Sequence, residues 1–469
     1  MKKIFLAFFL SIISFNLVHA ITLSEALSEA YKNNPELNAE RENLNISEED
    51  LKISRSEFLP SITISGSKSS EDTDKNTNRS GADTAVTDVN PKTQSVLIEQ
   101  KLFQGFAGVA GYEKNKLGLN LAQAKFLKKE QDILFKAVEA YTGLTLAREK
   151  FDINQSNVNL SERQVETDRS RLERGQVTLA DVAQSESSLA ESQAKLIESQ
   201  NEVLTSKLEY ERVVGPLNSI DNLNGNYGLS FEVPSSLNQA IEISKDNSPD
   251  LIIAKIEYQQ SEKDLTIAKS ELSPSATLSL ESSKTDDLSA TVDERDKETV
   301  KATISWPLFK GGKNFAEINR SKSLKNRKQL LYEYALRTNE TEVASAWANL
   351  QSTESLLNSV KLQVKAAEIA NEGISAEYES GLGRSTLDLI QSNTILLNSK
   401  ISLANSERNY LLAKFNLLKS IGLLNSNYLK IQQIHHLLVN LIFLLLMRTK
   451  CVHLNYDSTV KKPKKKGKK

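Results

Sequence analysis

The sequence predicts a mainly α-helical protein with a small β part, in which long antiparallel coiled-coil helices follow short strands. Three observations lead to this prediction. The chain consists of two copies of one unit of about 210 residues. Each copy contains a long proline-free stretch with apolar residues at every seventh position, which is typical of left-handed coiled coils. Each copy also contains two short segments in which apolar and polar residues alternate, which is the period of a strand.

The duplication is visible as constant offsets between matching residues. Near the start of each copy the offset is 214 residues, and it relates Leu23, Pro35, Leu51 and Pro60 to Leu237, Pro249, Leu265 and Pro274. Further on the offset is 206, which aligns "LFQG" at Leu102 with "LFKG" at Leu308. One extra residue then gives an offset of 207, which relates Asp181 to Asp388. Chance similarity is a poor explanation, because turns, prolines and strands match in the same order.

The repeats set the predicted domain organisation. Each copy is expected to contain a helix that ends before a proline, two strands separated by a polar loop, and two long helices. The predicted segments are a signal peptide (1–20), a first repeat (21–215; strands 59–69 and 94–103, long helices to 213), a linker (216–234), a second repeat (235–422; strands 274–283 and 299–309, long helices to 420) and an irregular tail (423–469) with a Lys-rich end. The stretches 108–174 and 311–380 predict rods of about 100 Å, at ~1.5 Å per residue.

The first 20 residues have every element of a secretory signal. Lys2 and Lys3 precede an apolar run from Ile4 to Val18, and a small-residue cleavage site ends at Ala20. The alternative is an uncleaved membrane anchor, but the run is short and polar residues interrupt it. We therefore expect an exported chain.

The composition excludes several classes of function. The net charge is −1, so bulk electrostatics indicates no nucleic-acid partner. Cys451 is the only cysteine, and between His19 and His435 the chain contains neither His nor Cys. Chemistry based on a His or Cys metal ligand or nucleophile is therefore improbable in the body of the chain. No catalytic constellation or phosphate-binding glycine loop is found, so we expect neither an enzyme nor a cofactor.

The four predicted strands have the length and the pattern of transmembrane β-strands. One face is apolar and the other is mostly small and polar, and aromatic residues gather at the strand ends next to the helices. These interfacial aromatics are Phe58, Phe103, Trp306 and Phe309, while Leu102 is assigned to the apolar face. Four strands cannot close a barrel, so strands must be shared between chains. Two chains would give eight strands and three would give twelve with a pore; a soluble four-stranded sheet is the alternative.

The layout resembles the TolC family of outer-membrane efflux proteins over nearly all of residues 21–430. The motifs that carry this resemblance are "NNPEL" with "NSPDL", "SEFLPSITIS" with "SELSPSATLS", "LFQG" with "LFKG", and "GQVTLADVAQSESSL" with "GLGRSTLDLIQSNTIL". The resemblance implies a homotrimer, with a 12-stranded barrel in the outer membrane continuous with an α-helical tunnel across the periplasm of a Gram-negative bacterium. It further implies a passive exit duct for small molecules or secreted proteins, served by a periplasmic adaptor and an inner-membrane pump or ABC transporter.

Two helix-to-helix turns carry the candidate mechanistic residues. Gly175, Gly381 and Gly383 permit the reversal of the backbone. Asp181 and Asp388 each lie one turn into the returning helix. Three copies of such a carboxylate around one mouth would select cations. The alternative is a helix-start charge that complements the helix dipole, and spacing alone favours it.

The resemblance implies that these turns close the periplasmic entrance through polar links between neighbouring helix pairs. Asp181, Tyr378 and Arg384 are then latch candidates, and Asp388 is the candidate for an acidic ring. An extra residue in the second turn leaves the placement of Arg384 open. Gln391 stands where the family can carry a second acidic residue, so we expect a less acidic ring.

Two alternatives to a duct were weighed. One is a trimeric coiled-coil spacer or adhesin anchored by a plugged barrel, and the other is the periplasmic adaptor itself. The duplicated unit, with two strands and long heptad helices in each copy, argues against an adaptor. The tail contains an apolar run of about 13 residues, too short to span a membrane, so it is read as an insertion or a reading-frame error. The Lys-rich end is expected to be a solvated tail.

Overall fold

The computed structural model describes residues 21–430, apart from 85–87, 218, 221–222, 224–230, 290 and 381–382. The chain divides into two compact units, each assembled from segments of both repeats. Within the described residues, the first unit comprises 21–38, 127–248 and 339–430, and the second comprises Ala39–Phe126 and Pro249–Thr338. The predicted signal peptide and the tail beyond residue 430 lie outside the described residues.

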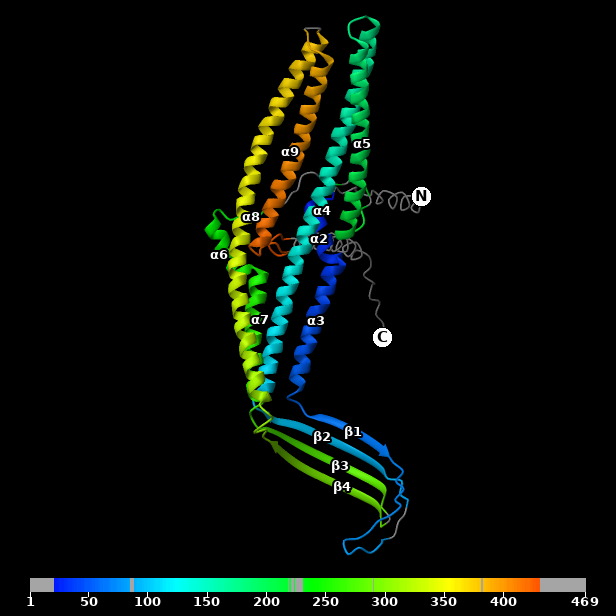
Figure 1. Ribbon diagram of the computed structural model, residues 1–469, viewed down its shortest axis with the longest axis vertical. Helices are drawn as coiled ribbons and strands as arrows, with labels where there is room; N and C mark the ends of the chain where they lie inside the picture. The colour runs from blue at the N-terminus through cyan, green and yellow to red at the C-terminus, as the bar shows by residue number, and fades with distance from the viewer. Residues whose placement is uncertain are drawn as a thin grey trace, which may run out of the picture. The chain divides into compact units, whose positions relative to one another are not determined.

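The second unit contains a four-stranded antiparallel sheet (Figure 1). Its strands are β1 (Ser61–Lys68), β2 (Lys92–Gln104), β3 (Ser275–Ser289) and β4 (Val292–Ser305), and they pair in the order β1-β2-β3-β4. The sheet therefore combines two strands from each repeat. Within the chain β1 and β4 are its two edges, each with one row of backbone groups that no neighbouring strand pairs.

The register gives the sheet one apolar and one polar face. Ile62 lies opposite Ile98, Ile98 opposite Leu280 and Leu280 opposite Val300. Residues directly opposite each other share a face, so these four side chains form an apolar row across the sheet. The next row is polar and consists of Ser61, Glu99, Ser279 and Lys301. Ile62, Leu280 and Val300 are exposed in the single chain, which is the pattern expected of a lipid-facing surface.

Leu102, which the sequence assigns to the apolar face, has no partner on β3. The register shifts between Lys101 and Phe103, so Phe103 lies opposite Ala276 and Leu102 is the extra residue. A β-bulge of this kind reverses the facing of the residues that follow it. Phe103 therefore continues the apolar face toward the helices.

The second pair of strands is longer than the sequence analysis proposed. The polar segment 284–298 was expected to be a loop, whereas β3 reaches Ser289 and β4 begins at Val292. Its charged residues pair across the strands, with an ion pair between Lys284 and Glu294, so polarity alone did not indicate a loop. β4 ends at Ser305 rather than at residue 309, because Pro307 cannot donate a hydrogen bond to the sheet.

Each of the two N-terminal helices expected as a single element is broken in two. The pieces are α2 (Leu23–Asn33) and α3 (Pro35–Ser56) in the first repeat, and α6 (Leu237–Asn247) and α7 (Pro249–Ser270) in the second. Each break falls on the residue before a proline, and that residue is extended, with ψ 122° at Asn34 and ψ 119° at Ser248. The proline ring disfavours helical geometry at the residue before it.

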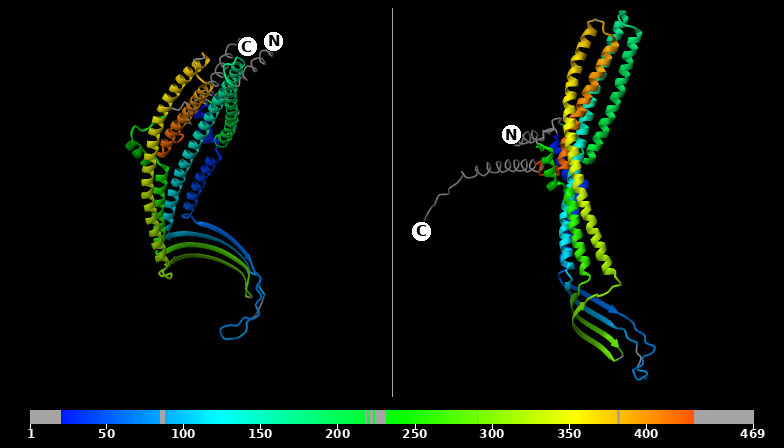
Figure 2. Two further views of the ribbon diagram at one scale, coloured as in Figure 1. Left: turned by 45° about the horizontal axis from the view of Figure 1, so that its top comes forward. Right: turned by 60° about the vertical axis from the view of Figure 1, so that its left-hand side comes forward.

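The long helices follow the predicted heptads. They are α4 (Ala107–Glu173), α5 (Leu179–Val213), α8 (Lys313–Glu379) and α9 (Thr386–Ser420), and both repeats give helices of 67 and 35 residues. In both views of Figure 2, α5 returns antiparallel beside α4, and α9 beside α8. Heptad residues that are buried include Leu144, Val158, Val165, Val182, Tyr210, Val343, Leu350, Leu357, Val364, Leu389 and Leu417. The seven-residue period thus marks the contact surface within each hairpin.

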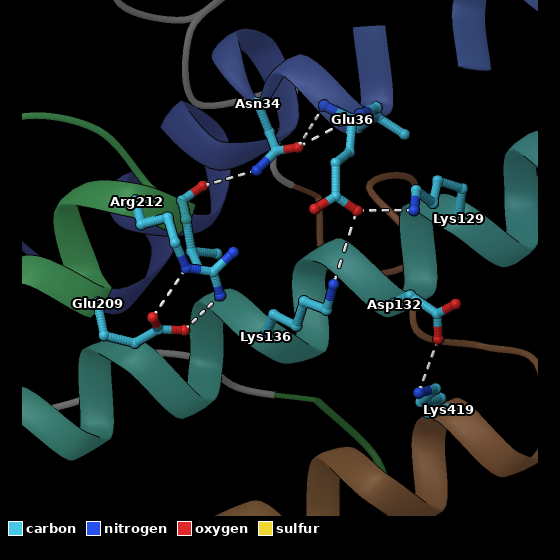
Figure 3. A network of polar contacts seen from close by, with 10 residues as sticks. Asn34, Glu36, Lys129, Asp132, Lys136, Glu209, Arg212 and Lys419 are labelled. Atoms are coloured by element: carbon cyan, nitrogen blue, oxygen red, sulfur yellow. Dashed lines mark hydrogen bonds and ion pairs between the residues drawn. The ribbon is translucent and has the colours of Figure 1, made fainter. Parts of the chain in front are cut away.

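Polar contacts join α3, α4, α5 and α9 near the start of α3 (Figure 3). The carboxylate of Glu36 accepts a hydrogen bond from Lys129 Nζ at 2.7 Å and lies 3.6 Å from Lys136 Nζ. The hydrogen bond from Lys129 is the main reason that the pKa of Glu36 lies below its ordinary value. Asn34 donates to the carbonyl oxygen of Val213 at 3.0 Å. The residues in the break before Pro35 are therefore tied to the end of α5.

Candidate functional site

The two turns that join the long helices lie in the first unit. The first runs between Glu173 and Leu179, and the second between Glu379 and Thr386. Gly175 has φ +70° and Gly383 has φ +87°, a left-handed backbone that favours glycine. Gly381, the third predicted turn glycine, lies outside the described residues.

Asp181 and Asp388 cap the returning helices. The Oδ2 atom of Asp181 accepts hydrogen bonds from the backbone N–H and the hydroxyl of Thr178, both at 2.8 Å. Asp388 accepts the equivalent bonds from Ser385 at 3.0 and 2.9 Å. In both cases the bond from the backbone N–H is the main reason that the pKa lies below its ordinary value. Each turn thus has a complete capping box, and the geometry matches the helix-start alternative weighed above.

Loss of one cap should loosen the first turn of α5. Thr178→Ala removes the side chain that accepts from the Asp181 N–H, and loss of an N-cap costs about 1 kcal/mol. We expect amide hydrogen exchange over residues 179–182 to accelerate about fivefold. Thr205→Ala, in the middle of the same helix, should leave these amides unchanged. Equal exchange in Thr178→Ala and the parent would show that the box does not hold the turn.

The capping carboxylate also predicts a dependence on pH. Folding lowers the pKa of Asp181 below its ordinary value of 3.8. Its contribution is therefore fully present above pH 3.8 and is lost as the pH falls through the lowered pKa. The caps should thus be intact at neutral pH.

Tyr378 forms the most buried polar contact at these turns. Its side chain is 4% exposed, and its hydroxyl donates to the carboxylate of Asp168, which is fully buried. The same carboxylate accepts from Ser185 Oγ at 2.5 Å and from Gln164 Nε2 at 2.9 Å. Tyr378 belongs to α8, whereas its partner Asp168 belongs to α4. The contact therefore links the two helical hairpins of one chain.

Arg171 strengthens the same link. Its guanidinium lies 4.2 Å from the centroid of the Tyr378 ring and donates to the backbone carbonyl of Tyr378 at 3.1 Å. A guanidinium over an aromatic face is attracted by the ring quadrupole. Burial, followed by the bond to Asp168, raises the pKa of Tyr378 above its ordinary value of 10.0. The hydroxyl is therefore a hydrogen-bond donor throughout the neutral range.

Arg384 has its partner within its own hairpin. Its Nε donates to Glu377 Oε2 at 2.6 Å, and both side chains are well exposed. It lines a pocket of about 590 Å³ between the two turns, together with Arg171, Asp181 and Tyr378. Of the predicted latch residues, only Tyr378 makes a direct contact between the hairpins. Asp181 and Arg384 line the same pocket, but neither makes a direct contact between the two hairpins.

Sequence reasoning missed Asp168, Gln164, Arg171 and Ser185. One signal was available, because Asp168 follows the heptad residue Val165 by three positions and so lies on the apolar face of α4. A carboxylate at such a position requires hydrogen-bond partners. The sequence does not identify those partners, because Tyr378 lies 210 residues from Asp168 along the chain.

The predicted interfacial aromatics are all exposed in the second unit. Phe309 and Trp306 are the most exposed, and Phe58 and Phe103 less so. The indole N–H of Trp306 donates to the carbonyl of Leu272 at 3.0 Å, which fixes the ring. Their place in a membrane interface stays a prediction.

In the part of the chain that the structure describes, no group of three or more His, Cys, Asp or Glu side chains is arranged to hold a metal ion. None of the helices in these ranges combines the length and the apolar character needed to cross a membrane.

The fold defines a class of protein. A four-stranded sheet with open edges and an exposed apolar face, joined in a duplicated chain to two long helical hairpins, is the protomer of an outer-membrane channel. The sequence profile described as "Outer membrane efflux protein" matches residues 26–215 and 240–423. The chain therefore belongs to the outer membrane efflux protein family, with one matched segment in each repeat.

Relatives and solved structures agree with this family. The chain is 27% identical over 417 residues to the outer membrane efflux protein BepC of Brucella suis, covering 88% of this chain and 87% of BepC. It is 22% identical over 432 residues to the outer membrane protein TolC of Escherichia coli, covering 87% and 84%. The CmeC outer membrane channel of Campylobacter jejuni superposes with a TM-score of 0.76 at 18% identity, covering 85% of each chain. These findings confirm the predicted fold, the outer-membrane location and a function in efflux or secretion.

Proposed function

We propose that the chain is one third of a trimeric exit duct, whose periplasmic end is held closed by contacts between helical hairpins. The observation that carries this proposal is the open sheet, with unpaired edges at β1 and β4 and an exposed apolar face. In lipid, each unpaired backbone group costs several kcal/mol. Three chains pairing edge to edge would give a closed 12-stranded barrel wide enough for a pore.

A comparison of the repeats supports association through the helices as well. On α5 the apolar side chains of Ile197, Leu204 and Leu208 are exposed. At the offset of 207, the matching positions on α9 are Ala404, Leu411 and Phe415, of which Ala404 and Phe415 are buried within the chain. At these positions the surface of α9 is therefore largely buried within the chain, whereas the matching surface of α5 is exposed. A neighbouring copy would cover this apolar stripe on α5, which consists of Ile197, Leu204 and Leu208.

The trimer predicts the effect of charges on that stripe. The double variant Ile197→Glu with Leu204→Glu should remove the trimer, because it would bury two carboxylates without partners. Native mass spectrometry of the detergent-extracted protein measures this directly. The control Ile197→Leu with Leu204→Ile keeps the surface apolar and should stay trimeric. A charged variant that remains a stable trimer would place the interface elsewhere.

At the turns, Tyr378 is the proposed latch within each chain. Its buried bond to Asp168 and its contact with Arg171 favour the state in which the hairpins lie together. Asp181 and Arg384, which line the pocket beside it, are proposed as contacts to a neighbouring chain, and Asp388 as the acidic ring. A periplasmic adaptor would separate the hairpins, and an inner-membrane pump or ABC transporter would supply the cargo.

Single-channel conductance in planar bilayers tests the duct. We expect a low conductance in the parent that rises when the latch is removed. An oligomer that never conducts, in the parent or in the latch variants, would favour the alternative of a structural protein or adhesin anchored in the outer membrane. Cross-linking followed by co-purification would identify the adaptor and transporter. AprF of Pseudomonas aeruginosa, 21% identical over 408 residues (84% of this chain and 83% of AprF), is an alkaline protease secretion protein, so the search should include protein-secreting transporters.

A further inference from the structure

The junction between β2 and α4 contains two consecutive residues with left-handed backbone. Gly105 has φ +60° and Phe106 has φ +70°. Glycine is required at the first position, because a Cβ atom there would lie 2.6 Å from the carbonyl oxygen of Ser270. Phenylalanine at the second position is unusual, since bulky residues rarely adopt positive φ. Such strain persists only when the surrounding structure enforces it.

The second repeat shows which residues adopt this turn without backbone strain. At the offset of 206, Gly105 and Phe106 match Gly311 and Gly312. These two residues have φ +61° and +81°, so both junctions have a similar backbone. Glycine adopts this conformation freely. The first repeat therefore carries a phenylalanine where the backbone alone favours glycine, and a function of the side chain would explain it.

The ring of Phe106 packs against Phe103, a residue of the apolar face. It is 67% exposed and meets the ring of Phe103 edge to face, with centroids 5.6 Å apart. Phe103 lies opposite Ala276, which in turn lies opposite Ile304 on the apolar face. β2 is an inner strand of the sheet, flanked by β1 and β3. The edges available to another chain are β1 and β4, so strand pairing between chains does not involve β2, which ends at Gln104, shortly before Phe106.

A groove of about 200 Å³ lies beside the ring. Its apolar lining consists of Phe58, Leu102, Phe103, Phe106 and Val109. Its polar lining consists of Glu57, Lys101 and Gln104. The groove thus opens between the end of β2 and the first turn of α4, and its apolar walls suit a hydrocarbon chain.

We propose that Phe106 and this groove hold an acyl chain of a phospholipid in the membrane leaflet next to the helices. The site rests on the proposed membrane-embedded barrel, because the apolar face of the sheet must meet lipid. A lipid is the occupant that fits, because Phe103 in the lining of the groove continues the apolar face that meets lipid in the proposed barrel. The second repeat lacks the ring, so each chain would carry one such site.

The matched variant is Phe106→Gly, which restores the residue that the other repeat uses and therefore suits the backbone. The probe is palmitoyl-oleoyl phosphatidylethanolamine added to delipidated protein in detergent, with retained lipid counted by native mass spectrometry. We expect Phe106→Gly to assemble normally, to conduct like the parent, and to retain less than half as much lipid. Equal retention by variant and parent would overturn the proposal. A protein that conducts neither as the parent nor with Tyr378→Phe would instead contradict the proposed duct, independently of the lipid count.

A second measurement locates the ring. Phe106→Trp is placed in a background with Trp306→Phe and Trp347→Phe, so that it is the only indole, and is reconstituted into vesicles of phosphatidylcholine brominated on the acyl chain. We expect at least twofold quenching of its fluorescence. The control Tyr334→Trp, in the same background and at an exposed position on α8, should not be quenched. A Phe106→Trp indole quenched no more than the control would mean that the ring contacts something other than lipid.

Discussion

Tyr378→Phe is expected to raise the open fraction of the duct by about tenfold or more. The change removes only a hydroxyl, yet that hydroxyl is the donor by which α8 contacts the fully buried carboxylate of Asp168 on α4. Leaving a buried acceptor short of a donor costs about 1–3 kcal/mol. The loss falls on the state in which the hairpins lie together, and every 1.4 kcal/mol is a factor of ten in the equilibrium.

Ser185→Ala is the matched control for this variant. Ser185 also donates to Asp168, at 2.5 Å, but it lies on α5, in the same hairpin as Asp168. Its loss should destabilise that hairpin without releasing the other one. Single-channel recordings should therefore show a higher conductance for Tyr378→Phe and a parent-like conductance for Ser185→Ala. A rise in both variants would indicate general loosening, and a rise in neither would contradict the latch.

The latch should be insensitive to pH over the neutral range. Because folding raises the pKa of Tyr378, its contribution is fully present below its ordinary value of 10.0 and is lost as the pH rises through the raised pKa. Without an adaptor, the conductance of the parent duct should thus rise only in strongly alkaline solution, whereas Tyr378→Phe should lack this alkaline transition. Arg384→Ala should add to the effect of Tyr378→Phe only through the proposed contact with a neighbouring chain, because within its own chain Arg384 pairs with Glu377 of the same hairpin.

The sequence predicted those parts of the fold that depend on periodic patterns. Heptads predicted coiled-coil helices, because every seventh side chain packs on the neighbouring helix, and the proline-free stretches placed the ends of the two longest helices within two residues of those observed. Alternation found all four strands but not the outer halves of β3 and β4. There the residues are polar on both faces, as in Lys284, Asp286, Glu294 and Asp296, and pair across the strands. Composition alone therefore predicts a loop for such a segment.

The candidate site likewise has a part that the sequence predicts and a part that it does not. The caps at Asp181 and Asp388 follow from a Ser/Thr-x-x-Asp spacing, which is local. The contact between Tyr378 and Asp168 is not local, and Tyr378 was singled out by family resemblance alone. No spacing rule relates side chains on helices of different repeats. Their contact depends on how two hairpins pack, and this requires coordinates.

Gly422→Ala is expected to have the largest effect on stability of any single substitution considered. Gly422 follows α9 with φ +80°, and a Cβ atom there would lie 2.2 Å from the carbonyl oxygen of Asn247 and 2.7 Å from the backbone nitrogen of Ser248. These are backbone atoms in the break before Pro249, so they cannot rotate away as a side chain could. Strained backbone costs about 1–3 kcal/mol, and overpacking adds about 1–3 kcal/mol.

Gly215, the matching residue of the first repeat, supplies the control for Gly422→Ala. It also has positive φ, at +133°, but the nearest atom to an added Cβ is Glu29 Cγ at 4.0 Å. Gly215→Ala should therefore lose only the backbone contribution, and Gly422→Ala roughly twice as much. Apparent melting temperatures of the two variants in detergent give this comparison. Equal losses would mean that Gly422 has room for a Cβ atom beside the α6–α7 break. Only the left-handed backbone would then make glycine necessary at both positions.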